Sequence, residues 1–521
     1  MTSLLDDHAE AIVARPGPLP PCWWQTRWFV IAAMVAAALP LLWPGVPPLT
    51  DLPGHLGRYR VELDIASNPH LADWYAFRWA LIGNLGIDLL VVPLSKLFGL
   101  ELAVKLIVVA IPVIMAGALL AIAREVHGRV PATALFALPL AYGFPFHYGF
   151  ANFALSMSLA LLAFVPWLRL GRHRHERFRA ALFVPVSCII WLCHVYGWGL
   201  LGLLAFSSEV ARRPDRRPGS LVKAALACLP LCLPVLLMAI WRAGDVAGGT
   251  GDWFNMPVKL LWALSVLRDR WEVFDLVSAC ILFFVVLVAI PVARQRFAPG
   301  LGLGAVLLAA AFLLIPRILL GSAYADMRLA PYALAVALVA LRPIEGHSAR
   351  TLVAWAALAF CVVRLAATTV SFALYDARYD RELAALDHIP TGARLVSFVG
   401  FPCGERWYSP RLLHLPGLAL ERRRAYSNDQ WSMAGAQLLT TRYAAAGAFT
   451  ADPSEVVVAD ECPAGFSTVS QALAAFPRDA FDYVWLIDPP PYRADSVRGL
   501  VPIWRSGPSV LFRIDHSPAA R

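Results

Sequence analysis

The sequence predicts a polytopic α-helical membrane protein that carries a C-terminal soluble domain. Of its 521 residues, 59% are hydrophobic and only 16% are charged, and the mean hydropathy is +0.61. A soluble protein of this size would carry roughly 25% charged residues. Several apolar runs reach the roughly 20 residues that cross a bilayer, and these runs stop before residue 376. We therefore expect a transmembrane part followed by a domain, 376–521, of α/β or α+β character.

The chain divides in order into a tail, a membrane domain and the C-terminal domain. Residues 1–27 are polar, proline-rich and slightly acidic, unlike a basic cleavable signal peptide, and are interpreted as a cytoplasmic tail. Residues 28–375 then form the transmembrane domain, whose first outer loop covers 45–102. Length and hydropathy predict about eleven transmembrane helices. These are 28–44, 103–123, 130–144, 149–168, 179–193, 196–210, 220–241, 274–293, 299–317, 327–342 and 351–374.

The arginines determine the predicted orientation. The two most basic loops read RLGRHRHERFR and RRPDRR, and a cytoplasmic N-terminus places both in the cytoplasm, as the positive-inside bias requires. This orientation requires residues 83–99 to form an interfacial helix and not a span. The C-terminal domain is then periplasmic, on a bacterial inner-membrane protein. Because the net charge of +9 is spread over such short loops, it indicates topology and contact with membrane lipids, not nucleic-acid binding.

The C-terminal domain carries its own strand and helix signals. The runs 396–399 and 483–487 read as strands, and 468–476 reads as a helix. Cys403 and Cys462 are the only two of the nine cysteines in this domain. An oxidising exterior would allow them to form a disulfide.

One short stretch, residues 47–59, contains the principal candidate residue, Asp51. Prolines and glycines set a turn before and inside this stretch, which would hold the Asp51 side chain where the chain leaves the membrane. A carboxylate there, with His55 four residues on, can accept a proton or help to hold a metal ion. The alternative is that Asp51 only caps the helix that begins near Leu52 and Pro53.

Further polar candidates lie at the outer ends of the predicted spans. Arg328 begins a span beside Tyr324 and Asp326, where it either binds a phosphate bidentately or extends to lipid headgroups. His147 and His194 lie at tight breaks between spans, flanked by aromatic residues. Each either contacts a substrate or metal, or is an interfacial turn histidine.

Arg364 lies near the middle of the last apolar run. A cation at that depth costs about 2.5–3.5 kcal/mol on insertion scales. Its position indicates either a functional role or a structural ion pair with a carboxylate.

The order of these segments resembles that of the GT-C superfamily of membrane glycosyltransferases. The shared features are one span after a cytoplasmic N-terminus, a long outer loop that opens with an Asp, an amphipathic segment ending in Leu-Phe-Gly (97–99), many short spans and a C-terminal exterior domain. Residues 93–129 are similar to the segment after the first outer loop in the branch of the protein O-mannosyltransferases and lipid A aminoarabinose transferases. The sequence-specific part of the resemblance covers residues 47–129.

The resemblance implies transfer of a sugar from a polyprenyl-phosphate donor to a glycan, lipid or protein acceptor at the outer membrane face. The family's first acidic residue maps onto Asp51, as a base or as a ligand of a divalent ion such as Mg²⁺ or Mn²⁺. Where the aminoarabinose branch has Lys-Pro-Pro-Leu, this chain has Asn84-Leu85-Gly86-Ile87-Asp88, which leaves the acceptor open. The family's second acidic residue has four competing matches: Asp88, Asp245, Asp252 and Asp326. The expected substrate-binding residues are His55, Asn84, Asp88, His147, His194, Tyr324, Asp326 and Arg328.

Two other classes of function stay open. A lipid-linked sugar transporter or flippase would also be polytopic, but it would favour inverted repeats with paired broken helices, and no repeat is visible in the sequence. A non-catalytic envelope-assembly protein would need neither Asp51 at the membrane mouth nor Arg328 facing it. The P-loop, Rossmann, GxSxG and CxxC motifs are absent from the sequence, so it gives no support to cytosolic nucleotide chemistry.

Overall fold

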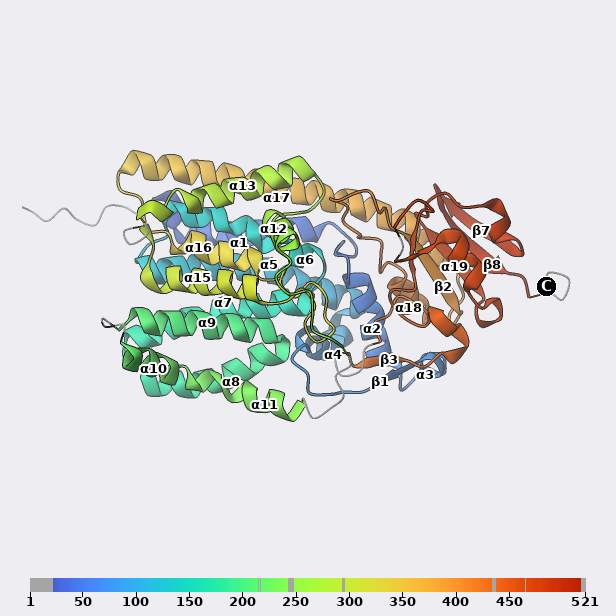
Figure 1. Ribbon diagram of the computed structural model, residues 1–521, viewed down its shortest axis with the longest axis horizontal. Coiled ribbons are helices and arrows are strands. Elements are labelled where there is room, and N and C mark those ends of the chain that lie inside the picture. Colours follow the sequence, from blue (N-terminus) through green and yellow to red (C-terminus); the bar gives the residue numbers. More distant parts are fainter. Residues whose placement is uncertain are drawn as a thin grey trace, which may run out of the picture.

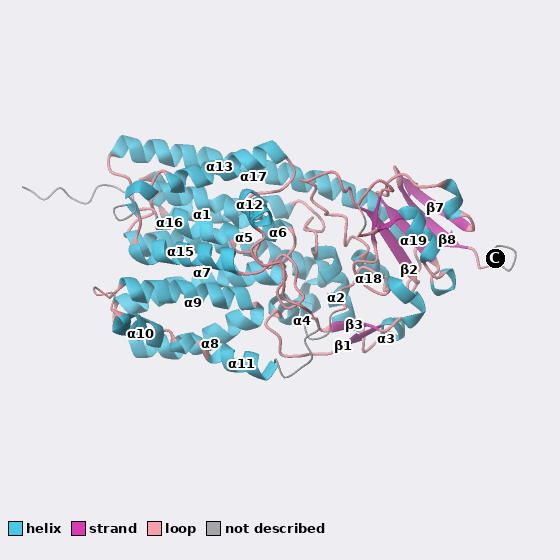
Figure 2. Ribbon diagram, in the orientation of Figure 1, coloured by secondary structure: helices cyan, strands magenta, loops and turns pink. Residues whose placement is uncertain are grey.

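Helices run side by side at one end of the molecule, and a β-sheet with short helices forms the other end (Figure 1). The structure is a computed structural model that describes residues 22–213, 215, 217–241, 248–292, 296–432, 437–463 and 465–516. Most of the predicted cytoplasmic tail lies outside these residues. Strands are confined to the half of the molecule that holds the C-terminal residues (Figure 2).

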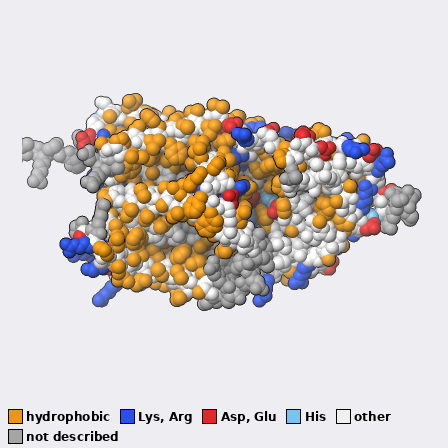
Figure 3. Space-filling model, viewed as in Figure 1, with side chains coloured by type: hydrophobic (Ala, Val, Ile, Leu, Met, Phe, Trp, Pro, Cys, Tyr) orange, Lys and Arg blue, Asp and Glu red, His pale blue; other side chains and the backbone are white. Residues whose placement is uncertain are grey.

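The apolar segments of the sequence form the helical bundle. Such segments become helices because a membrane offers no water to backbone N–H and C=O groups, which must then bond within the segment. In chain order, the bundle contains α1 (Arg27–Leu42), α5 (Leu100–His127), the 3-10 helix η2 (Ala132–Tyr142), α6 (Phe144–His147), α7 (Ala151–Arg172), α8 (Glu176–Cys193), α9 (Val195–Ala211), α10 (Pro218–Ala227), η3 (Leu229–Leu231), α11 (Leu233–Trp241), α12 (Met256–Leu264), α13 (Glu272–Leu287), η4 (Ile290–Val292), α15 (Pro299–Leu314), α16 (Ala330–Ala340), α17 (His347–Leu383) and η5 (Ala384–His388). Apolar side chains cover much of its visible face (Figure 3).

Helix length supports fewer membrane crossings than the hydropathy of the sequence predicts. Among the described residues, four helical segments are long and apolar enough to cross a membrane: Leu100–His127, Ala151–Arg172, Glu272–Val292 and His347–His388. A fifth crossing is possible if α10 and the helix after it, which meet at a 45° bend, form one span. The bend contains Pro230, which cannot donate a backbone hydrogen bond. The multi-pass character is thus supported, while the number eleven stays a prediction.

The first predicted outer loop folds into α2 (Leu52–Asp64), α3 (Pro69–Trp74), β1 (Tyr75–Phe77) and α4 (Gly86–Phe98). Helix α4 corresponds to the predicted interfacial segment 83–99. It buries Ile87 and Asp88 and exposes Leu89 and Leu97, as an amphipathic helix does. Its position at the membrane surface stays a prediction.

The C-terminal unit is built on a six-stranded mixed sheet in the order β5-β4-β2-β6-β8-β7. Strands β5, β4, β2 and β6 run parallel to one another, and β8 runs antiparallel to both β6 and β7. The predicted strands and helix are confirmed as β2, β6 and α19. The elements are β2 (Leu395–Gly400), α18 (Gly417–Arg423), β3 (Leu439–Thr441), η6 (Ala444–Phe449), β4 (Val456–Val458), β5 (Ser467–Thr468), α19 (Val469–Ala475), η7 (Arg478–Ala480), β6 (Tyr483–Ile487), η8 (Ala494–Val497), β7 (Leu500–Ser506) and β8 (Ser509–Ile514).

The first loop and the C-terminal unit share one hydrophobic core. Leu71 and Tyr75 of the loop pack in the same buried cluster as Phe398 and Tyr426, and β1 pairs with β3 in an antiparallel ribbon. The Cys403–Cys462 disulfide expected from the sequence is present in this unit. Helix α17 continues to Leu383, past the predicted domain boundary at residue 375, which stays a prediction. The junction between bundle and sheet is therefore a shared structure, and it holds Asp51.

Candidate functional site

Asp51 lies at the N-cap position of α2, but its side chain makes no capping hydrogen bond. The Asp51 backbone N–H instead donates to the carbonyl of Tyr148, at 3.0 Å. Gly149, which has φ of +98°, packs directly against Asp51; a Cβ atom there would come within 2.6 Å of the Asp51 nitrogen. The carboxylate, 8% exposed, is thus held in place by the backbone while its oxygens are left unused by the helix.

The nearest basic group to Asp51 comes from the C-terminal unit. Nε2 of His414 lies 3.9 Å from Oδ1 of Asp51, and Nδ1 of the same ring lies 3.9 Å from Oδ2 of Asp429. The ring of Trp431 lies 4.4 Å from that of His414 and 4.9 Å from that of His55, measured between centroids. The predicted residue His55 therefore belongs to this site as a stacking partner.

A glycine makes this approach of the two chain segments possible. Gly417, the first residue of α18, lies against the start of α2, and a Cβ atom on it would come within 2.8 Å of the Gly54 Cα. Any larger side chain would push α18 away from α2. His414, three residues before Gly417, is brought toward Asp51 by this contact.

Three side chains beside Asp51 could hold a metal ion. His414, Asp452 and Glu455 each offer a ligand atom, and these atoms all lie within 4.8 Å of one another. Both carboxyl oxygens of Glu455 and Nδ1 of His414 are buried without a hydrogen-bond partner among the described residues. Buried polar atoms are nearly always satisfied in proteins. Their lack of partners, with one imidazole and two carboxylates in reach, fits a divalent cation.

The carboxyl groups of the site are unusually hard to ionise. Burial raises the pKa of Asp51 to about 7, although His414 and Arg328 act in the opposite direction. Burial also raises the pKa of Asp429 and, together with the neighbouring Asp452, that of Glu455. A positive charge brought to this place would favour the ionised forms.

Arg328 is buried opposite Asp51 without a carboxylate partner among the described residues. Its guanidinium lies over the ring of Phe150 at 4.1 Å, and Nη2 donates to the hydroxyl of Ser322 at 3.1 Å. Nη1 lies 3.5 Å from Nε2 of His194. Asp51 and Arg328 each influence the pKa of the other through their charges. The structure thus brings together three predicted residues: Asp51, His194 and Arg328.

Aromatic residues and a second arginine extend the site. Tyr324 and Tyr148 lie with ring centroids 5.2 Å apart. Arg268 is also buried without an ion pair to a described residue: Nη2 donates to the Tyr408 carbonyl at 2.7 Å, and the guanidinium lies 4.8 Å from the ring of Phe144. Tyr148 and Tyr324 lie close enough to Arg268 to influence its pKa.

The other predicted residues make structural contacts elsewhere. Asp326 forms an ion pair with Lys259 at 3.1 Å, and Asp88 forms one with Arg58 at 2.8 Å. The carbonyl of Asn84 accepts a hydrogen bond from Asn152. Neither Asp88 nor Asp326 is therefore a free second acid.

His147 and Arg364 take part in one buried network that joins the bundle to the C-terminal unit. Nδ1 of His147 lies 2.7 Å from Nη2 of Arg411, which also binds Asp269 at 2.6 Å. Arg364 binds Asp275 at 2.7 Å, and the side chain of Asp275 accepts a hydrogen bond from the Asp269 N–H. Of the two alternatives that the sequence left open for Arg364, the structure shows the ion pair with a carboxylate.

Of the two remaining candidates for the second acid, only Asp252 lies among the described residues. Asp252 lies 3.5 Å from Arg317 and accepts hydrogen bonds from Asn255. Asp245 lies outside the described residues.

The residues that the sequence did not reveal come from the C-terminal unit: His414, Asp429, Trp431, Asp452 and Glu455. Four of the five lie in two short polar runs, Asn428-Asp429-Gln430-Trp431 and Asp452-Pro453-Ser454-Glu455, and His414 lies apart from both. Asn428, Asp429 and Gln430 of the first run, and Glu455 of the second, are buried. A polar run that interrupts the strand pattern was the available signal.

The fold is similar to that of a solved membrane protein. ArnT from Cupriavidus metallidurans, solved bound to undecaprenyl phosphate, is 13% identical to this chain, and the match covers 94% of this chain and 98% of ArnT with a TM-score of 0.50. The arabinofuranosyltransferase AftD from Mycobacteria matches at 15% identity over 94% of this chain and 40% of AftD, with a TM-score of 0.47. No protein-family model and no curated protein matches the sequence. At this identity the likeness shows that the chain shares the overall fold of ArnT.

Proposed function

We propose that this protein is a membrane glycosyltransferase that moves a sugar from a polyprenyl-phosphate-linked donor to a lipid, glycan or protein hydroxyl. One observation carries the proposal: a buried carboxylate, Asp51, lies close enough to a buried arginine, Arg328, for their charges to act on each other, and Arg328 has no ion pair with a described carboxylate, in a chain with the ArnT fold. An acid and a cation kept apart in this way are suited to a reaction in which a proton is removed and an anion leaves.

In the proposed reaction, Asp51 acts as the base. The acceptor hydroxyl attacks the anomeric carbon while its proton passes to the Asp51 carboxylate. The new bond joins the acceptor oxygen to the sugar, and the bond between the anomeric carbon and the phosphate oxygen breaks. The electron pair remains on the phosphate, which leaves as polyprenyl phosphate.

Arg328 is the residue that we assign to the donor phosphate. A guanidinium binds phosphate oxygens in a bidentate manner, and here two of its nitrogens are oriented by Ser322 and His194. ArnT was solved with undecaprenyl phosphate, which supports a polyprenyl phosphate as the leaving group here. Arg268 and the Tyr148–Tyr324 pair would line the same side.

The metal site is assigned to His414, Asp452 and Glu455, and Oδ1 of Asp51 lies 3.9 Å from Nε2 of the same His414. A divalent ion bound there would supply positive charge beside the donor phosphate. Of the two ions expected from the resemblance, Mn²⁺ fits better, because Mg²⁺ takes oxygen ligands almost exclusively.

We place the site at the periplasmic face of the bacterial inner membrane. The Cys403–Cys462 disulfide supports this assignment, because disulfides persist in oxidising compartments. The arginine-rich loops at the opposite end of the bundle support a cytoplasmic location for that end. In intact spheroplasts, an impermeant maleimide should label Trp253→Cys and not His173→Cys, both of which are exposed positions. The reverse pattern would overturn the orientation.

The experiment that tests the function is Asp51→Asn, assayed in a deletion strain at matched membrane abundance. Asn retains the size and capping ability of Asp but removes the base. Modification of lipid or glycan should fall about 10²–10⁴-fold, the usual contribution of a positioned base. Asp64→Asn, at the far end of the same helix, is the control and should retain activity. Full complementation by Asp51→Asn would remove Asp51 from the reaction.

A further inference from the structure

A second polar cavity lies at the end of the bundle far from Asp51. It has a volume of about 800 Å³ and is enclosed by the ends of α5, α7 and α9, the start of α15 and the segment after α16. These ends lie on the left of the bundle in Figure 1, opposite the sheet. The reaction proposed above makes no use of this cavity.

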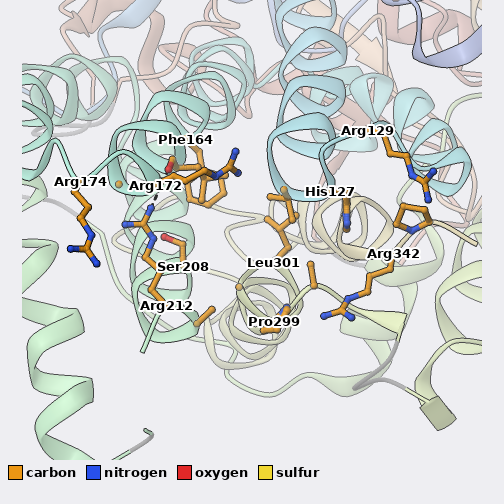
Figure 4. Close-up of a pocket in the computed structure, with 17 residues that line it drawn as sticks. His127, Arg129, Phe164, Arg172, Arg174, Ser208, Arg212, Pro299, Leu301 and Arg342 are labelled. Atoms are coloured by element: carbon orange, nitrogen blue, oxygen red, sulfur yellow. Dashed lines mark hydrogen bonds between the residues drawn. The ribbon is translucent and has the colours of Figure 1, made fainter. Parts of the chain in front are cut away.

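Arginines dominate its rim. Figure 4 shows Arg172 and Arg212 on one side of the cavity and Arg129 and Arg342 on the other, with Arg174 farther out. Aspartate and glutamate are absent from its described lining.

The charge of this rim is only partly balanced. Arg172 lies 3.0 Å from Glu125, and Arg212 lies 3.4 Å from Glu209. Glu209 is shared, since Arg179 also binds it at 2.7 Å. Arg212 in addition donates to the carbonyl of Leu168 at 3.1 Å. Arg172 and Arg212 are therefore already engaged in contacts between the ends of the helices.

The other three rim arginines, Arg129, Arg174 and Arg342, make no ion pair with a described residue. Like-charged guanidinium groups around one cavity repel one another. An anion bound between them would relieve this repulsion.

The wall of the cavity is apolar below the arginines. Phe164 and Leu301 are buried there, and Leu168 and Val126 line it farther out. A small inorganic anion would make no use of this wall. A molecule with a phosphate at one end and acyl chains at the other would use both the rim and the wall.

We propose that this cavity binds an anionic phospholipid, with its headgroup phosphate between Arg129 and Arg342, with Arg174 adding positive charge farther out on the rim, and with an acyl chain along Phe164, Leu168 and Leu301. Basic pockets between transmembrane helices are suited to such headgroups. The site is independent of the proposed reaction, because its residues come from the opposite end of the bundle.

The test uses the full chain purified in detergent, with dioleoyl phosphatidylglycerol as the probe and native mass spectrometry as the readout. The variant replaces Arg129, Arg174 and Arg342 each with Gln. The control replaces Arg124, Arg177 and Arg217 each with Gln; these are exposed at the same end and do not line the cavity. Both triple variants lose the same charge, and thermal unfolding checks that both are folded.

The rim variant should bind phosphatidylglycerol about 100-fold more weakly, since each basic side chain near an anionic headgroup contributes about a fivefold effect, while the control should bind almost normally. A second variant, Ala211→Trp, fills the cavity without changing its charge and should also lose binding. Dioleoyl phosphatidylcholine should bind weakly to all forms.

Three results would overturn the proposal. Equal weakening in both triple variants would mean that only the overall surface charge matters. Displacement of the lipid by millimolar inorganic phosphate would identify a small-anion site. At least tenfold preference for undecaprenyl phosphate would identify a second site for the donor's carrier lipid.

Discussion

Buried charges are arranged differently inside the bundle and at its junction with the sheet. In the bundle, Arg364 is paired with Asp275 and Lys259 with Asp326, at 2.7 and 3.1 Å. At the junction, Arg328 has no ion pair with a described residue, and both oxygens of Glu455 lack partners among them. An unpaired buried charge costs several kcal/mol. The difference distinguishes paired charges, which stabilise the bundle, from unpaired buried groups at the junction, to which we assign the proposed ligand site.

The largest effect should come from breaking a pair in the bundle. Arg364→Gln leaves Asp275 buried without its cation, and we expect the free energy of unfolding to fall by about 3–5 kcal/mol. The same substitution at the junction, Arg328→Gln, removes a charge that has no partner and should leave stability unchanged or higher. Unfolding of both variants in matched detergent measures this contrast. Equal losses in the two would end the distinction between the regions.

Activity should respond in the opposite way at the junction. Arg328→Gln should lower the transfer rate about 10²–10³-fold, because it removes preorganised charge from the leaving phosphate. Arg317→Gln provides the control, since Arg317 is partly exposed, lies over the ring of Tyr324 and pairs with Asp252. Initial rates with a polyprenyl-phosphate sugar measure both. Normal rates in Arg328→Gln would assign this arginine to lipid contact.

Metal binding sharpens the comparison between two buried carboxyls. At a Mn²⁺ concentration 100 times its Kd, the wild-type protein should gain about 2.7 kcal/mol of stability, and Glu455→Gln should lose this gain. Glu62 is the matched control: it too has oxygens without partners, but it lies outside the metal group. Its Gln variant should keep the Mn²⁺ response. Loss in both variants, or in neither, would contradict the assigned ligands.

The smallest effect concerns pH. Burial raises the pKa of Asp51 to about 7, and the base must be ionised to accept a proton. The rate should therefore fall about tenfold for each pH unit below 7 and level off above it. Rates between pH 5 and 9, with unfolding followed in parallel, measure this limb. A flat profile over that range would indicate a carboxylate of ordinary pKa.

The sequence predicts the fold to a large extent because its signals are local. Apolar runs mark most helices of the bundle, although α12 falls in a predicted loop, and the residue patterns of 396–399, 483–487 and 468–476 predict two strands and a helix. The number of spans is harder, because α16 has only 11 residues and η2 is a 3-10 helix containing Pro139. Such short segments give a hydropathy signal without the length of a full crossing.

About half of the candidate site residues could also be identified from local signals in the sequence. Asp51 and Arg328 stand out because a charge next to an apolar run is conspicuous. His414 and Glu455 do not, because a polar residue in a soluble domain is ordinary until packing buries it. Arg364 could not be assigned from sequence, since its partner Asp275 lies 89 residues away. Ion pairing depends on the tertiary structure. The pairs seen in the structure therefore show which charged residues have a structural role.

The contact of α2 with α18 has a consequence for biogenesis. Asp51 leaves the ribosome early, whereas His414 follows roughly 360 residues later, about 20 to 70 s at ordinary rates of synthesis. Until α18 docks through Gly417, Asp51 lacks its contact with His414. The C-terminal unit also does not yet close the side of the site that lies opposite the proposed phosphate position. Under the proposed function, a nascent chain already inserted in the membrane should therefore be inactive toward lipid-linked sugars. We expect activity only after the C-terminal unit has packed against the first loop.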